Sequence, residues 1–321
     1  MKKVTKICFI VAAALILTGL ILLGGVMGSI KWDFKKLSTV TFETNEYEIT
    51  EAFQALSVNT DTAEVTFAPS ENQSCSVVCY EKSKVKHSVT VKGDTLSIEA
   101  VDERQWYDHI GFGLETPKIT VYLPKGEYGT LSIQSSTGDI NIPKEFQFES
   151  IDISENTGRV TNYASSSGLI KIKTSTGSIR VENLSAGSLD LSVSTGKVTV
   201  SNTICKGDVS VKVSTGRSVL TDIRCENLVS NGSTGEITLT NVIATERFSI
   251  KRSTGDVNLN GCDAAELFIK TDTGDVEGTL LSEKVFIANT DTGDKKVPNT
   301  LTGGRCEVTT DTGDIELRIQ K

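Results

Sequence analysis

From residue 131 to the C-terminus, apolar and polar residues alternate in short runs, which is typical of strands with one buried face. The alternation changes phase at each Thr-Gly pair. Around Gly196 the apolar positions are odd-numbered before the glycine and even-numbered after it: Leu189, Leu191, Val193, Val198 and Val200. The chain must therefore turn at the Thr-Gly step, and we expect each unit to hold a strand, a corner and a second strand.

The Thr-Gly pair recurs ten times with gaps of 19 or 20 residues. A fixed period of this length indicates a repeat architecture before any local propensity is considered. Glycine suits such a corner because it takes positive φ without a steric penalty. The predicted structural corners are Gly138, Gly158, Gly177, Gly196, Gly216, Gly235, Gly255, Gly274, Gly293 and Gly313.

A second corner is predicted six residues after the glycine, at Asn183, Asn202, Asp222 and Asn241. Asn and Asp tolerate the left-handed conformation and bond locally to the backbone. The residues that follow these corners are expected to point inward: Leu184, Thr203, Ile223 and Val242.

Each repeat is then one coil, and stacking coils about 4.8 Å apart buries a continuous core. The predicted fold class is all-β, a parallel β-helix or β-solenoid of about ten coils of 19 to 20 residues. The competing architecture is an antiparallel meander or a propeller. Propeller blades repeat at about 40 residues or more, and hairpins favour two-residue Asn-Gly or Asp-Gly turns, so neither matches this unit.

Residues 31–130 hold alternating strands without the strict period, and we expect an irregular β segment that caps residues 131–321. Residues 102–115 differ in composition and contain Trp106, Tyr107, His109 and Phe112. Two interpretations stay open for this stretch, a loop that covers the core and a recognition loop.

Residues 7–30 carry no charge and follow Lys2, Lys3 and Lys6. An apolar run of this length spans a bilayer, whereas the core of a signal peptide has about 7 to 15 residues. We expect an uncleaved signal anchor with residues 1–6 in the cytoplasm and the bulk of the chain outside it, and a cleaved signal peptide is the alternative. Lys31, Lys35 and Lys36 weaken the charge asymmetry that sets this orientation.

Composition excludes several functions. The formal net charge of −8 offers no electrostatic footprint for nucleic acid. The chain has two histidines, His87 and His109, and no HExxH, GxSxG or Walker-type motif. The protein is therefore predicted not to be an enzyme, and no catalytic or cofactor-binding residue is assigned.

Seven cysteines give no paired framework. Cys75 and Cys79 would lie about 13 Å apart along one strand, too far apart to form a disulfide. Cys205 and Cys225 both follow their glycine by nine residues, so stacking places them near one another. A disulfide and two buried thiols both fit that position, and the thiols are the favoured interpretation.

The last three corners read TDTGD and bring six aspartates into neighbouring coils: Asp272, Asp275, Asp291, Asp294, Asp311 and Asp314. Six stacked carboxylates repel one another, and a hard divalent cation would relieve that cost. Weak Ca²⁺ binding is one hypothesis, and solvated turns screened by salt are the other.

The chain resembles the bacterial β-strand-repeat family of unknown function whose members are labelled "putative adhesin". The resemblance rests on the corners STGDI, STGEI and STGDV, on KITVYLPKGEYGTLSIQSSTGDI and on QALSVNTDTAEVTFAP, and it covers residues 50–321. It implies a membrane-tethered or secreted β-solenoid at a bacterial surface. This sequence departs from the pattern where an inward apolar residue is expected, at Asn162, Ser218, Gly278 and Lys295.

The predicted function is a non-enzymatic surface scaffold or adhesin that contacts an envelope polymer or another surface protein. The alternative is a regulatory or sensory partner in a cell-envelope stress response, in which the anchor would contact a partner helix. Gly19, Gly24, Gly25 and Gly28 would let two helices approach closely.

Overall fold

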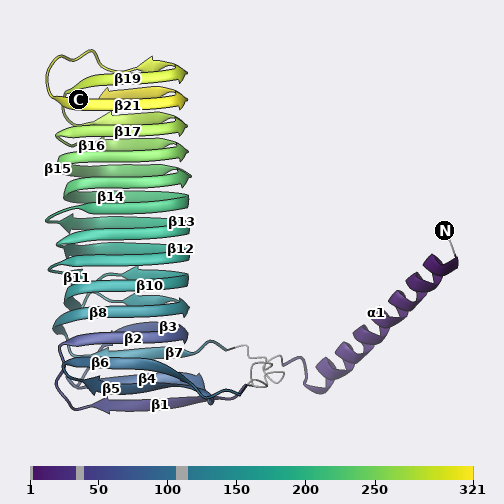
Figure 1. Cartoon of the computed structure of the whole chain (residues 1–321). Helices are drawn as coiled ribbons and strands as arrows, with labels where there is room; N and C mark the ends of the chain where they lie inside the picture. Colours follow the sequence, from purple (N-terminus) through teal and green to yellow (C-terminus); the bar gives the residue numbers. More distant parts are fainter. Residues whose placement is uncertain (1–2, 34–39, 106–114, 321) are drawn as a thin grey trace.

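The computed structural model describes residues 3–33, 40–105 and 115–320. One helix, α1 (Lys3–Ser29), precedes a single continuous sheet wound into a rod (Figure 1). The strands are β1 (Phe42–Ile49), β2 (Ala55–Thr62), β3 (Glu64–Pro69), β4 (Cys75–Lys82), β5 (Val85–Lys92), β6 (Thr95–Asp102), β7 (Lys118–Leu123), β8 (Gly126–Thr137), β9 (Ile140–Ile142), β10 (Phe146–Asn162), β11 (Ser165–Ser166), β12 (Leu169–Ala186), β13 (Ser188–Cys205), β14 (Val209–Thr234), β15 (Ile237–Thr254), β16 (Val257–Cys262), β17 (Glu266–Thr273), β18 (Val276–Leu280), β19 (Lys284–Thr292), β20 (Lys295–Lys296), β21 (Gly304–Thr312) and β22 (Ile315–Ile319).

Equivalent positions of successive repeats pair in parallel and in register. Gly158 pairs with Gly177, Gly177 with Gly196, and Gly196 with Gly216. The predicted β-solenoid is therefore confirmed, and the antiparallel meander is excluded for these coils.

The Thr-Gly corners need glycine for two reasons. Their φ angles lie between 121° and 157°, a range that side chains other than hydrogen rarely allow. The coils also approach closely, because a Cβ added to Gly196 would lie 1.7 Å from the carbonyl oxygen of Gly177. Corner amides also bond to the neighbouring coil, as where Gly235 N donates to Thr254 O at 2.8 Å. The repeated glycine thus sets the spacing of the stack as well as the turn.

The second set of corners is confirmed in conformation. Asn183, Asn202, Asp222 and Asn241 have φ between 47° and 56°. Asn202 Nδ2 also donates to Asn183 Oδ1 at 3.0 Å, so stacked amides link two coils. The four residues that follow these corners are all buried, including Thr203, whose hydroxyl donates to Ser201 O at 2.9 Å.

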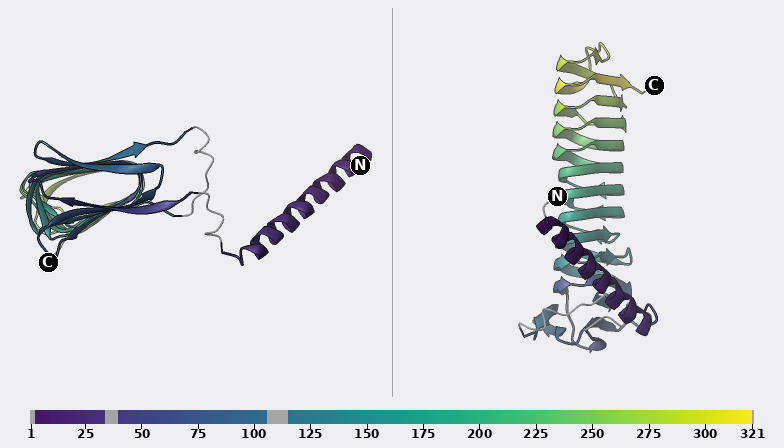
Figure 2. Two further views of the ribbon diagram at one scale, coloured as in Figure 1. Left: turned by 90° about the horizontal axis from the view of Figure 1, so that it is seen from below. Right: turned by 90° about the vertical axis from the view of Figure 1, so that its right-hand side faces the viewer.

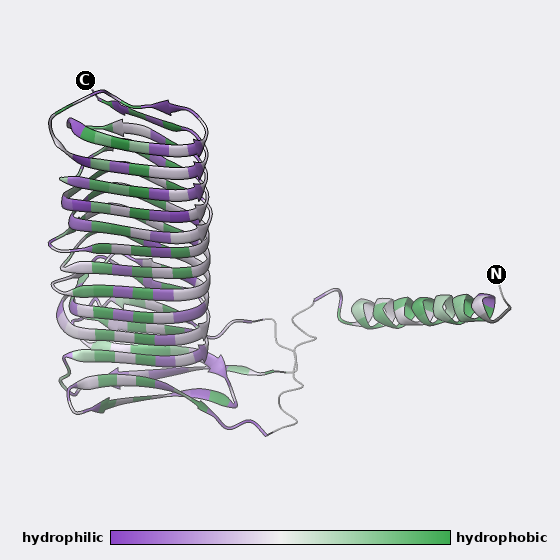
Figure 3. Ribbon diagram, turned by 45° about the horizontal axis from the view of Figure 1, so that its top comes forward, coloured by the Kyte–Doolittle hydropathy of each residue, from purple (hydrophilic) through white to green (hydrophobic). Residues whose placement is uncertain are grey.

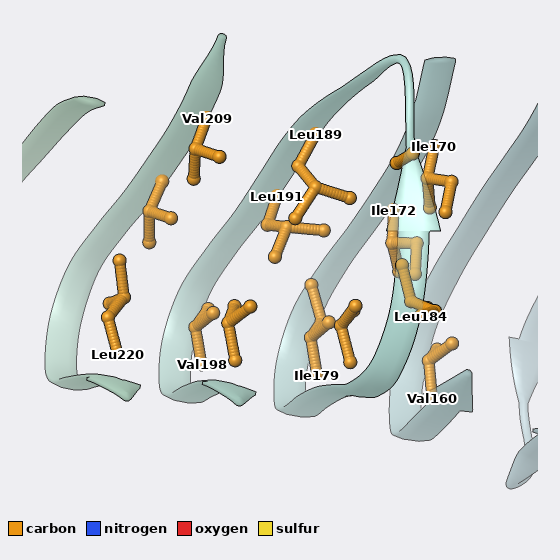
Figure 4. Packing of buried hydrophobic residues seen from close by; sticks show 14 of the residues in the cluster. Val160, Ile170, Ile172, Ile179, Leu184, Leu189, Leu191, Val198, Val209 and Leu220 are labelled. Carbon is orange, nitrogen blue, oxygen red and sulfur yellow. The ribbon is translucent and has the colours of Figure 1, made fainter. Parts of the chain in front are cut away.

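Aliphatic side chains fill the interior of the rod in columns. Ile170 stacks on Leu189 and Ile172 on Leu191, and Val160, Ile179 and Val198 form another column (Figure 4). Apolar and polar positions alternate along nearly every strand of the rod (Figure 3). This arrangement agrees with the alternation in the sequence.

The N-terminal end of the rod is closed differently. β1 pairs with β4, β4 with β7, and β5 with β6, all antiparallel. In contrast, β2 and β3 pair in parallel with β8 and β9 and form one more coil of the regular kind. Ala63 stands where the other coils have glycine, so the stack extends into the segment assigned to the irregular part of the chain.

At the C-terminal end, the coils do not stack in the order of the sequence. β21 pairs with β17 on one side and β19 on the other, and Figure 1 shows β21 between them. β22 likewise lies between β18 and β20. The three TDTGD corners are adjacent as expected, but their order along the rod is Gly274, Gly313, Gly293.

The four departures from the apolar pattern have separate outcomes. Asn162 is buried, and its side chain bonds to the backbone N–H and C=O of Ala164. Ser218 is buried and accepts from Arg252 Nη2 at 3.5 Å. Gly278 lies beside a register shift between β16 and β18, and Lys295 is exposed on the end coil.

The described residues contain one helix long and apolar enough to cross a membrane, Thr5–Ser29, with a mean hydropathy of 2.8. Its large side chains from Ile7 to Val26 are exposed, and no strand covers them (Figure 2). A signal sequence near the N-terminus can meet the same criteria of helix length and hydropathy.

Candidate binding surface

The strand that follows the Thr-Gly corner presents a flat polar face to solvent. One outward column on this face runs through six paired coils: Thr199, Val219, Thr238, Asn258, Glu277 and Glu316. These positions face outward because they alternate with buried residues such as Val198, Leu239 and Leu259. Hydroxyl, amide and carboxylate groups therefore repeat along one straight line.

A shallow hollow of about 370 Å³ lies on this face near the C-terminal end. Its lining comes from β15, β16, β18 and β22, so four stacked coils contribute to it. The lining residues are Thr238, Leu239, Asn258, Leu259, Asn260, Glu277, Gly278, Thr279, Glu316 and Arg318.

Gly278 is the residue that distinguishes this place from the rest of the face. It lies between Glu277 and Thr279 where other coils carry an inward apolar side chain, and it has φ 144°. A Cβ at this position would lie 1.8 Å from Leu259 O. Gly278, Leu239 and Leu259 line the hollow together with the polar side chains of its rim.

The rim of the hollow carries both charges. Arg318 Nη2 bonds to Glu316 Oε1, and Lys296 Nζ lies 3.9 Å from Glu316 Oε2. Amides at Asn258 and Asn260 and the hydroxyl at Thr279 add donors and acceptors. Such a set can bond to an extended, polyhydroxylated molecule, whereas it holds no nucleophile and base at bonding distance from each other.

The C-terminal coil is essential to this geometry. Glu316 and Arg318 belong to β22, which reaches the hollow only because it pairs with β18. Stacking in sequence order would place β20 there, with Lys295 and Lys296, and would bring a basic rim in place of the carboxylate. The glycine at position 278 is one signal of this site in the sequence, whereas no residue pattern indicates the partner coil.

The predicted aspartate cluster lies at the corners on the edge of the rod, outside the hollow. Asp314 N donates to Asp275 Oδ1, and Asp294 N donates to Asp314 Oδ1, both at 2.7 Å. Asp275 N similarly donates to Asp256 Oδ1 at 3.0 Å. These carboxylates thus cap the amide of the next coil, which gives the aspartate after the glycine a structural role that the sequence analysis did not find.

The other three aspartates, Asp272, Asp291 and Asp311, precede the glycines on the same edge. Within the described ranges, three potential ligand atoms lie within 4.8 Å of one another at one place, formed by Cys79, Glu81 and His87 and not by the aspartate corners.

The six cysteines of the rod are buried and are not bonded to one another, whereas Cys8 is exposed on α1. Cys205 and Cys225 are buried as free thiols, in agreement with the favoured interpretation. Burial raises the pKa of each thiol to about 12. Cys75 and Cys79 are also free, as their spacing along β4 predicts.

A larger hollow of about 760 Å³ lies near the N-terminal end, against the corners of the first coils. Its rim includes Glu64, Lys118 and Glu115, and Lys118 Nζ lies 2.9 Å from Glu64 Oε2. Most of the aromatic stretch at residues 102–115, which was expected to be either core cover or a recognition loop, lies outside the described residues. The hollow at Gly278 is formed by the regular coils alone, and we treat it as the candidate site.

The fold and this surface define a class of protein, a β-solenoid of stacked parallel coils that offers polar faces in place of a deep cleft. The model of the Toastrack family of domains of unknown function, DUF4097, matches residues 53–216 and 203–321. The chain therefore belongs to the Toastrack family.

Solved structures with related shapes include three bacterial proteins. A "putative adhesin" from Parabacteroides distasonis is 12% identical, with a TM-score of 0.45 and coverage of 87% of this chain and 98% of that one. A "putative adhesin" from Bacteroides fragilis is 15% identical, with a TM-score of 0.32 and coverage of 87% and 97%. A "putative lipid binding protein" from Parabacteroides distasonis is 11% identical, with a TM-score of 0.30 and coverage of 88% and 98%. No curated protein sequence matches the chain.

Proposed function

We propose that the protein is a non-enzymatic binding module, held at the cell membrane by α1, whose rod contacts an extended polymer of the cell envelope. The observation that carries this proposal is the hollow at Gly278, where four coils line up hydroxyl, amide and carboxylate groups. A polymer with repeated hydroxyl groups can bond to such a column over several coils, because the coils repeat about every 4.8 Å.

The charge and the shape of the rod favour this class of ligand. The chain has a net charge of −8, which opposes binding to nucleic acid or to another acidic polymer. The hollow is shallow and open to a long flat face, so it suits an extended molecule better than a small one that needs to be enclosed.

The anchor is part of the same proposal. α1 is apolar around its whole circumference, and its span of 25 residues is long enough for a bilayer. With the basic residues before it inside the cell, the rod would stand outside the cytoplasm and could reach the envelope.

The test is a binding assay with the full chain in detergent and fractionated polysaccharides of the cell envelope. The informative variant combines Asn258→Ala and Glu277→Ala, which removes two polar groups from the hollow. The matched control combines Thr199→Ala and Val219→Ala, which lie in the same outward column, two coils and one coil beyond Thr238 at the edge of the hollow.

We expect the hollow variant to raise the Kd about tenfold, the equivalent of about 1.4 kcal/mol, and the control variant to leave it unchanged. Equal weakening by both variants would place binding along the whole face. The absence of retention on any polysaccharide fraction would contradict the proposal.

A second candidate function uses the anchor itself. Gly24 and Gly28 are four residues apart on α1, and a Cβ at either would meet no atom within 4 Å. Small residues with this spacing let two membrane helices pack closely. This observation favours a regulatory partner in a cell-envelope stress response.

An exchange of residues 7–30 for an unrelated apolar span separates the two functions. If the rod binds a polymer, the exchange leaves binding intact while the protein stays in the membrane. If the helix contacts a partner, the exchange abolishes the stress response, and Gly24→Leu with Gly28→Leu gives the same loss. A response that survives both changes would contradict the regulatory role.

A further inference from the structure

The N-terminal cap contains a buried group of polar side chains that the surface does not use. Cys79 and Glu81 both point inward from β4, because they are two residues apart on one strand. His87 points inward from β5, just after the turn that joins the two strands. All three are buried, and His87, the most accessible, is only 4% exposed.

The ligand-type atoms of these residues converge on one point. Cys79 Sγ, a carboxylate oxygen of Glu81 and a ring nitrogen of His87 all lie within 4.8 Å of one another. His87 Nδ1 lies 2.7 Å from Glu81 Oε2. Thiolate, carboxylate and imidazole are the ligands that zinc uses in proteins, and three of them leave one position of a tetrahedral site for water.

A second layer of hydrogen bonds fixes the orientation of these groups. His87 Nε2 lies 2.9 Å from Thr60 Oγ1, which leaves Nδ1 as the nitrogen that faces the cluster. Asn45 Nδ2 donates to Glu81 Oε1 at 2.7 Å, and the backbone N–H of His87 donates to Oε2 at 2.7 Å. Metal-binding histidines and carboxylates are held in this way by partners on their outer side.

Charge also favours a dication at this place. The cluster offers one buried carboxylate, at Glu81, and one buried thiol, at Cys79. A divalent ion would be the largest local charge there and would stabilise a bound thiolate. One thiolate and one carboxylate would then neutralise the ion inside the cap.

We propose that Cys79, Glu81 and His87 form a binding site for one divalent ion of the zinc type. The site would tie β4 to β5 and, through Asn45, to β1, the first strand of the rod. Binding replaces the proton on Cys79 Sγ, which passes to solvent, and uses His87 as the neutral imidazole whose proton is on Nε2, facing Thr60 Oγ1. A thiolate ligand disfavours Ca²⁺ and Mg²⁺, which prefer oxygen.

The test uses the full chain in detergent, stripped of metal, reduced and titrated with Co²⁺ as a spectroscopic probe for Zn²⁺. We expect one equivalent of Co²⁺ per chain, a thiolate-to-cobalt charge-transfer band, and loss of both signals on addition of Zn²⁺. Equilibrium dialysis with Zn²⁺ alone measures the same stoichiometry independently.

The matched variants are Cys79→Ser and Cys75→Ser. Both cysteines are buried on the same face of β4, four residues apart, but only Cys79 belongs to the cluster. Cys79→Ser should abolish the charge-transfer band and weaken Zn²⁺ binding at least 100-fold, whereas Cys75→Ser should change neither. Thr60→Val, which removes the outer bond to His87, should weaken binding about 10- to 100-fold with the band retained.

Circular dichroism of each variant shows whether the rod is folded. If Cys79→Ser unfolds the cap, the Zn²⁺ affinity of the folded Thr60→Val variant tests the proposal in its place. No retention of Zn²⁺ or Co²⁺ by the folded wild-type chain would overturn the proposal. Binding that persists unchanged in Cys79→Ser, or a band that is lost in Cys75→Ser, would overturn it as well.

Discussion

The regular coils and the N-terminal cap determine the surroundings of their residues in different ways. In the coils, the conformation of a residue follows from its place in the repeat. The corner glycines from Gly138 to Gly313 all have φ between 121° and 157°. In the cap, each buried polar group has its own partners, as in the contacts of Glu81 with His87 and Asn45. Because the coils repeat, their structure can be predicted from the sequence. The cap has no repeat, and its buried polar residues form contacts that occur once in the molecule.

The largest effect on stability is expected from a substitution at a corner glycine in the middle of the rod. Gly196→Ala would place a Cβ 1.7 Å from Gly177 O at a φ of 145°. The corner and the neighbouring coil are each held in place by the coils stacked on them, so they cannot move apart to accept the Cβ. We therefore expect Gly196→Ala to lower the free energy of unfolding by about 4 kcal/mol. Denaturant unfolding checks this. The control is Gly126→Ala, where a Cβ meets no atom within 4 Å, and an equal loss there would show that corner geometry is not the cause.

The next largest effect is a dependence of the free energy of unfolding on pH, caused by a carboxyl group buried in the coils. Burial raises the pKa of Glu155 from 4.5 to about 7, and the side chain is 1% exposed. The folded chain therefore keeps a proton that the unfolded chain releases, and stability falls as the pH rises from about 4.5 through about 7. Since each pKa unit is worth about 1.4 kcal/mol, the full difference approaches about 3 kcal/mol.

Glu155→Gln has no proton to lose, so the variant should keep most of that stability at pH 8. Thermal unfolding of both proteins at pH 4.5 and pH 8 measures the difference, and Glu149→Gln on the exposed face is the control. A parallel pH profile for wild type and Glu155→Gln would show that the buried carboxyl is not the cause.

A smaller effect comes from the coil nearest the cap. Ala63 holds the place of a corner glycine but has no positive φ. Ala63→Gly adds freedom to the unfolded chain without relieving strain, and we expect a loss of about 1 kcal/mol. A gain in the free energy of unfolding, measured in denaturant, would show that the same corner rule governs the end coil.

The smallest effect is the response of the TDTGD corners to Ca²⁺. Two of their carboxylates, those of Asp275 and Asp314, already accept backbone amides, which lowers the need for a cation. We predict weak binding that raises the Tm by about 1 to 2 °C at millimolar Ca²⁺. The variant Asp272→Asn with Asp311→Asn should remove the rise, and an unchanged Tm in wild type would end the calcium hypothesis.

Much of the rod could be predicted from sequence because its constraints repeat. The change of phase at Gly196 and the left-handed corner at Asn202 both recur in other repeats. Their equivalents could therefore be recognised in the sequence and assigned to the same position of each coil. The coil at Ala63 was not recognised as regular, since a single residue departs from Thr-Gly. The cluster at Glu81 and His87 depends on antiparallel pairing of two strands with no repeat, so the sequence showed only isolated polar residues.

The order of the last coils could not be predicted for a physical reason. The corners around Gly274, Gly293 and Gly313 have the same sequence, TDTGD, so any of the three satisfies the same hydrogen bonds on its neighbour. The inserted position of β21 and β22 is therefore not set by the corners. The hollow follows from that insertion, because Glu316 and Arg318 arrive with β22.

The most direct test of this account is a cross-linking comparison of two cysteine pairs in the full chain. Thr309 pairs with Lys270 on one side and Asn289 on the other, so Lys270 and Asn289 lie two coils apart, about 9.6 Å. With a thiol reagent shorter than that distance, we expect the Lys270→Cys, Thr309→Cys pair to cross-link within one chain and the Lys270→Cys, Asn289→Cys pair to stay open. Rapid linking of the second pair with none of the first would show that the coils follow sequence order, and the hollow would then lose its carboxylate rim.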